Sequence, residues 1–156
     1  MWCCEVITVP QSGIRVSTAF LQEMHLLSRD SGRMDNRFYQ TIASSASSSV
    51  ESKSKGAAIV YKRNLKIKVL DVWADTAGRL AVVKVELYGR KVAVISAHAP
   101  NKFAKTFYDT LTQKMLELPE YSLIVGADMN VVWHTDDRSS LSASKHQQLA
   151  TAALQS

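Results

Sequence analysis

Polar side chains follow three β-type runs of this sequence, at the point where each run ends. Glu23 comes directly after "STAFLQ", His98 closes "KVAVISA", and Asp128 and Asn130 follow "SLIVGA". In α/β sheets, ligands gather at the carboxyl ends of the strands. If these three ends lie together, the pattern predicts a functional site there.

The four side chains have the chemistry that phosphodiester hydrolysis needs. Mg²⁺ prefers oxygen ligands and often takes only one or two protein carboxylates beside phosphate oxygens and water, so Glu23 could be a metal ligand. Asp128 could orient or deprotonate an attacking water. Asn130 has amide donors for a phosphate oxygen, and His98 could donate a hydrogen bond or a proton to developing charge. A metal, an oriented water and such donors together form a phosphodiesterase site.

Each of these residues also has an interpretation without chemistry. Glu23 could be a solvated acid in a loop, and His98, just before Ala99–Pro100, could be a structural histidine. Asp128 and Asn130 could cap a turn, because Gly, Asp and Asn are turn residues. The residues alone leave both interpretations open.

The elements that must position these residues follow from the hydrophobic pattern. Gly89–Arg90, between two β-rich runs, predicts a hairpin, and a helix follows with Asn101 as its N-cap and Pro119 as its stop. A polar loop over 28–37 and a second helix from about Ser144 complete the prediction. Strands are predicted over 14–21, 38–44, 56–63, 66–75, 79–88, 91–98 and 121–128. This order predicts an α/β fold with a mixed sheet.

Composition indicates an ordinary globular chain. The 156 residues suit one domain, and the net charge of +5 favours a polyanionic partner only mildly. The adjacent Cys3 and Cys4 form no disulfide framework, and the start lacks the pattern of a signal peptide. No run is long enough to cross a membrane. We therefore expect an intracellular protein, nuclear or cytoplasmic, that is not secreted, with no membrane partner.

Four motifs in this order resemble the endonuclease/exonuclease/phosphatase superfamily, with its DNase I-like fold. They are "LQEMHL" (21–26), "KGAAIVYKR" (55–63), "AGRLAVVKVELYGRKVAVISAHAPN" (77–101) and "LIVGADMNVV" (123–132). The resemblance is greatest to the endonuclease domain of LINE-type retrotransposons, whose following loop is similar to "DDRSS" (136–140). It implies an α/β sandwich of mixed, largely antiparallel sheet with flanking helices, and a Mg²⁺- or Mn²⁺-dependent DNA endonuclease.

The resemblance also implies a role for each site residue. Glu23 matches the metal-ligand glutamate of the superfamily, and Asp128 and Asn130 match the pair that handles the nucleophilic water and the phosphate. His98 stands where members carry tyrosine or histidine. Contacts to nucleic acid, DNA or possibly RNA, are expected from basic residues, whose alternative is a solvated strand face. The candidates are Lys53, Lys55, Lys62, Arg63, Lys66, Lys68 and Arg138.

Two motifs of the superfamily have no match here. Only 22 residues precede Glu23, none of them is the expected asparagine, and "MWCCEVITVPQS" does not resemble the opening strand. No Ser-Asp-His motif occurs before Ser156, and His146 does not match it. We therefore expect residues 1–156 to form a single incomplete domain with unpaired strand edges, a Ser-rich loop over 43–55, and weak or no hydrolysis. A non-catalytic nucleic-acid-binding remnant and a phosphatase of the same superfamily are the alternatives.

Overall fold

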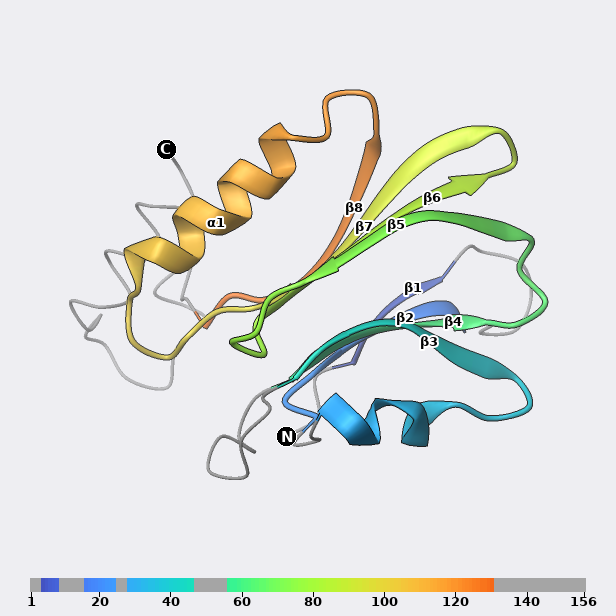
Figure 1. Cartoon of the computed structure of the whole chain (residues 1–156), viewed down its shortest axis with the longest axis horizontal. Coiled ribbons are helices and arrows are strands. Elements are labelled where there is room, and N and C mark those ends of the chain that lie inside the picture. The colour runs from blue at the N-terminus through green and yellow to red at the C-terminus, as the bar shows by residue number, and fades with distance from the viewer. Residues whose placement is uncertain (1–3, 9–15, 25–27, 47–55, 131–156) are drawn as a thin grey trace. The chain divides into compact units, whose positions relative to one another are not determined.

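The computed structural model describes residues 4–8, 16–24, 28–46 and 56–130. Of these, the residues up to His98, with Glu120–Asp128, form one compact unit, and Ala99–Pro119 with Met129 and Asn130 belong to a second. The first unit holds two four-stranded sheets (Figure 1). Among the described residues, no helix is long and apolar enough to span a membrane.

The first sheet is antiparallel throughout, with strand order β1-β2-β4-β3. Its strands are β1 (Cys4–Thr8), β2 (Val16–Gln22), β3 (Tyr39–Ser45) and β4 (Ala57–Lys62). The opening residues thus do form a strand, and it pairs with β2. The expectation of unpaired strand edges is wrong for β2, because Cys4–Thr8 pairs with it from Cys4 opposite Leu21 to Thr8 opposite Val16.

The second sheet is mixed, with strand order β5-β6-β7-β8. It contains β5 (Ile67–Ala74), β6 (Leu80–Leu87), β7 (Arg90–His98) and β8 (Ser122–Asp128). Only β7 and β8 run parallel. The predicted mixed, largely antiparallel arrangement is confirmed.

The hairpin between β6 and β7 is confirmed, but its turn lies one residue earlier than predicted. Tyr88 and Gly89 occupy the turn, with φ of 49° and 75°. Positive φ at both central residues is the geometry of a type I′ turn, whose twist matches that of the flanking strands. Arg90 is already the first residue of β7.

The predicted helix is α1 (Lys105–Leu116), in the second unit. Its N-cap is Ala104, without a side-chain hydrogen bond, so the prediction of Asn101 as the cap is wrong. The helix ends before Pro119, as predicted. A 3₁₀ helix, η1 (Ser28–Met34), replaces the first part of the predicted 28–37 loop.

Some predictions lie wholly or partly outside the described residues. These are the helix from about Ser144, Lys53, Lys55, Arg138 and residues 47–55 of the Ser-rich stretch. The first residues of that stretch, up to Ser45, belong to β3.

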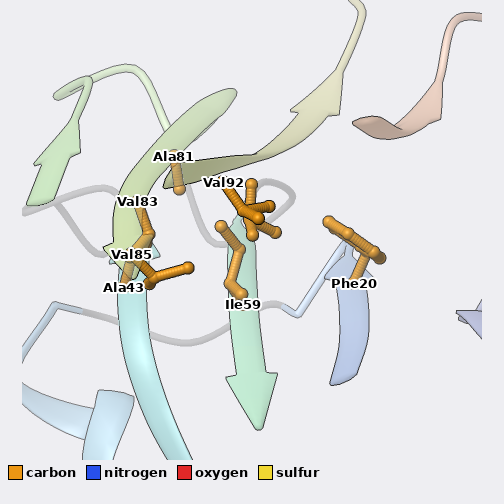
Figure 2. Packing of buried hydrophobic residues seen from close by; sticks show 8 residues of the cluster. Phe20, Ala43, Ile59, Ala81, Val83, Val85 and Val92 are labelled. Carbon is orange, nitrogen blue, oxygen red and sulfur yellow. The ribbon is translucent and has the colours of Figure 1, made fainter. Parts of the chain in front are cut away.

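The core of the first unit lies between the two sheets, which face each other through alternate residues of their strands (Figure 2). Successive side chains of a strand point to opposite faces, so one residue in two can enter this layer. The buried cluster consists of Phe20, Ala43 and Ile59 from the first sheet and Ala81, Val83, Val85, Val92 and Val94 from the second.

Gly126 of β8 is a point of close approach between the sheets. A Cβ atom added there would lie 2.2 Å from Cγ of Phe20, and the aromatic ring is 0% exposed. No side chain fits in that space, since even a methyl group needs more than 3 Å from carbon neighbours. The glycine in "LIVGADMN" is therefore a packing residue within a strand, not part of a turn.

We predict that Gly126→Ala lowers the free energy of unfolding by about 1 to 3 kcal/mol, the usual cost of overpacking a well-filled core. Urea unfolding measures it. Gly32→Ala is the matched control, because a Cβ atom there meets nothing within 4 Å. Phe20→Leu should relieve part of the cost, so the double variant should be more stable than the sum of the two single changes implies. Equal effects of the two glycine changes would contradict the packing account.

Candidate functional site

The ends of β2, β7 and β8 bring three of the predicted residues to one edge of the first unit. Glu23 follows β2, while His98 and Asp128 are the last residues of β7 and β8. The parallel register pairs His98 with Asp128. Glu23 Oε1 lies 3.6 Å from Nε2 of His98. The structure thus joins a carboxylate of the first sheet to a histidine of the second.

The alternation of β7 and β8 shows which way these side chains face. Val92 and Val94 of β7 lie in the core between the sheets, and His98 has the same parity. Gly126 meets Phe20 of the opposite sheet, and Asp128, two residues on, has the same parity as Gly126. Both site residues therefore face the first sheet.

Glu23 and His98 differ strongly in their access to solvent. The Glu23 side chain is 45% exposed, and that of His98 is 3% exposed. The backbone of Glu23 has φ of 53°, a left-handed conformation that costs a residue other than glycine of order 1 kcal/mol. Strain of this kind persists where the surroundings fix it, and functional sites are common among such places. Glu23 is therefore held at this edge, with its carboxylate open to water.

Arg79 lies beside His98 at the candidate site, and the sequence did not indicate it. Its carbonyl accepts a hydrogen bond from the His98 N–H at 2.8 Å, and its Nη1 donates to the His98 carbonyl at 3.2 Å. Burial lowers the pKa of the Arg79 guanidinium, while the charges of Asp75 and Glu23 oppose that shift. The guanidinium stays protonated at neutral pH. The only signal in the sequence is its place directly before a strand, which is equally typical of a solvated arginine.

The loop over 75–79 joins β5 to β6 and holds Arg79 in place. Hydrogen bonds also link it to the first sheet. Asp75 Oδ1 accepts hydrogen bonds from the backbone N–H groups of Arg79 (2.9 Å) and Leu80 (3.1 Å). The hydroxyl of the buried Ser45, at the end of β3, donates to the same carboxylate and to the Asp75 carbonyl at 2.8 Å. Gly56, before β4, donates its N–H to the carbonyl of Gly78 at 3.1 Å. One carboxylate thus organises the loop beside the candidate site.

A buried side-chain amide links β2 to β8. Gln22 is 5% exposed, and its Nε2 donates to the Gly126 carbonyl at 3.4 Å. Because Gln22 precedes Glu23, and Gly126 lies two residues before Asp128, this contact sets the two acidic residues at the same edge.

Asn130 belongs to the second unit and is described there by itself. It has φ of 48°, and its Nδ2 donates to the carbonyl of Ala99 at 2.7 Å. This bond joins two segments of the second unit, as expected of a residue that caps a turn. The alternative without chemistry therefore has its strongest support at Asn130.

Two of the predicted basic residues that the structure describes, Lys62 and Arg63, lie away from this edge. β4 begins opposite the end of β2, and Lys62 closes it roughly 17 Å away at about 3.3 Å per residue. The guanidinium of Arg63 donates to the Asn36 carbonyl (2.8 Å) and to Oε1 of Gln40 (3.0 Å), and lies 3.8 Å from Asp35. Arg63 therefore braces the strand ends at the far side of the sheet.

The donor set at the edge fits a divalent cation of the Mg²⁺ type. Among the residues described, no group of three or more His, Cys, Asp or Glu side chains could form a closed metal cage. Mg²⁺ rarely uses such a cage, and keeps several waters beside one or two carboxylates. The half-exposed Glu23 carboxylate is a suitable ligand of this kind.

Comparison with known proteins supports the fold. No model of a known protein family matches the sequence. The endonuclease domain of TRAS1, a telomere-specific non-LTR retrotransposon, matches with a TM-score of 0.59 and 14% identity, over 90% of this chain and 57% of that domain. The catalytic domain of human nocturnin, solved with a bound sulfate anion, gives a TM-score of 0.48 and 18% identity, over 88% of this chain and 62% of that one.

The likeness to the TRAS1 domain shows a shared fold. The predicted DNase I-like α/β sandwich is confirmed at that level. This chain spans 57% of the length of that endonuclease domain.

We predict that Asp75→Ala lowers the free energy of unfolding by about 3 kcal/mol, because it leaves two backbone N–H groups without their acceptor and removes one of the two acceptors of the buried Ser45 hydroxyl. Urea unfolding measures the change. Asp109→Ala is the control, because its exposed pair with Lys105 contributes at most about 0.5 kcal/mol. A loss at Asp75 no larger than at Asp109 would contradict the bracing role of Asp75.

Proposed function

We propose that this chain carries a divalent-cation-dependent phosphodiester hydrolase site of the endonuclease type, acting on DNA. The observation that carries the proposal is the meeting of Glu23 and His98 at 3.6 Å, with Asp128 in register beside His98. The fold that holds them is shared with an endonuclease domain. The net charge of +5 suits a polyanionic substrate, and a DNA substrate agrees with the predicted nuclear or cytoplasmic location.

The residues divide the reaction among them. Glu23 would hold Mg²⁺ or Mn²⁺, which supplies positive charge to the phosphate. Asp128 orients the attacking water and takes its proton as the new P–O bond forms. His98 donates a hydrogen bond or a proton to the oxygen that leaves as the old P–O bond breaks. Asn130 is proposed, from its sequence motif alone, to donate to a phosphate oxygen.

We expect hydrolysis to be slow. His98 is the one histidine among the described residues, and it is buried against Glu23. Because His98 faces Glu23 and is assigned to the leaving oxygen, Asp128 must act as the base without help from that imidazole. The alternative, binding of nucleic acid without hydrolysis, rests on the net positive charge and on the basic residues at the far end of the first sheet.

Nicking of supercoiled plasmid tests the proposal. With Mg²⁺ we expect slow nicking that chelation abolishes, and a loss of about 100-fold or more in Glu23→Gln and in Asp128→Asn. Glu120→Gln is the matched control, because this exposed carboxylate pairs with Lys91 at the opposite end of β8. Its rate should equal that of the unchanged chain.

Two outcomes would contradict hydrolysis at this site. Nicking that survives in both site variants would come from another site or another protein. No nicking by the folded chain, together with DNA binding that weakens steeply as salt rises, would favour the binding alternative, since release of counterions gives phosphate contacts that salt dependence.

A further inference from the structure

Arg79 occupies an unusual position between the two halves of the candidate site. Two hydrogen bonds in opposite directions join it to His98, one from backbone to backbone and one from its guanidinium to the His98 carbonyl. His98 in turn faces Glu23 across 3.6 Å. Hydrogen bonds thus hold the Arg79 guanidinium on the histidine that faces Glu23, the carboxylate proposed above as the metal ligand.

Two acidic groups share this cation. The charges of Asp75 and Glu23 both act on the Arg79 guanidinium, which is partly buried. Asp75 is tied into its loop by three donors, whereas Glu23 is half exposed at the end of a strand. Glu23 is therefore the one of the two that a cation from solvent can reach.

We propose that Arg79 is a positioning residue that acts as the counterion of Glu23 and competes with a divalent cation for its carboxylate. This inference rests on the proposed function, in which Glu23 is the metal ligand. When the metal binds, Arg79 keeps Asp75 and the His98 carbonyl as partners, so its charge is not left buried alone. Arg79 thereby sets how much divalent cation the site needs and keeps His98 in place in both states.

The sign of the effect follows from Coulomb's law. A fixed positive charge near a metal site repels the metal, and removing the charge tightens binding. At an effective dielectric constant between that of protein and water, the repulsion amounts to roughly a factor of ten in affinity. A structural role alone would predict the reverse, because a loosened site binds metal less well.

Mn²⁺ binding to the full chain, followed by isothermal titration calorimetry, tests the proposal. We expect Arg79→Gln to bind Mn²⁺ about tenfold more tightly than the unchanged chain, and Arg79→Lys, which keeps the charge, to bind about equally. Glu23→Gln should lose the site. Lys84→Gln is the matched control, because it removes a cation paired with Asp71 on the neighbouring strand, and its affinity should not change.

A metal-free measurement separates this inference from the proposed function. In urea unfolding without divalent ions, Arg79→Gln should lower the midpoint more in the unchanged chain than in the Glu23→Gln background, as expected of coupled charges. Such coupling without Mn²⁺ binding would show that Glu23 holds no metal, while Arg79 would still be the counterion of Glu23. Absence of the coupling, or weaker Mn²⁺ binding in both Arg79 variants, would overturn the inference.

Discussion

The contact between the Phe20 ring and the backbone of Gly126 is the constraint on which the candidate site depends. It allows β2 of one sheet and β8 of the other to approach more closely than any side chain at position 126 would permit. Gln22 then donates to the Gly126 carbonyl, just before Glu23 on one strand and Asp128 on the other. An aromatic ring in the core thus determines the separation of two carboxylates at the edge, because strands are stiff over two or three residues and transmit the spacing.

The second constraint is the loop that begins at Asp75. The Asp75 carboxylate accepts hydrogen bonds from donors of both sheets. Arg79, the last residue of the loop, is hydrogen-bonded to His98 through its backbone and its side chain. Hydrophobic packing is not directional and would tolerate a slide of one sheet over the other, whereas these hydrogen bonds would not. The apolar core therefore holds the sheets together, and the polar loop sets their register where His98 and Glu23 meet.

Much of this arrangement could be predicted from the sequence, and the failures have physical reasons. The strands from β2 to β8 follow from apolar runs of the right length, and three site residues follow from the rule that ligands gather at strand ends. The Asn101 cap failed because helix starts depend on tertiary position as much as on the capping residue. The turn at Tyr88 was missed because an aromatic residue rarely takes a positive φ, and here the hairpin twist imposes it. Arg79 was missed because only the pairing of β6 with β7 shows that it lies beside His98.

The interpretation of "GADMN" (126–130) as a turn without chemistry can be compared with the structure residue by residue. Gly126 lies inside β8 and serves the contact between the sheets, and Asp128 is still in the strand, in register with His98. Only Asn130 behaves as a turn residue, with a left-handed backbone and an amide bound to Ala99. Two of the three turn-like residues thus owe their place to the sheet, and the one carboxylate among them shares its edge with a strained, half-exposed Glu23. A strand that merely ended in a turn would not need an acid just after the facing strand to be held in an unfavourable conformation, and this arrangement supports the site proposed above.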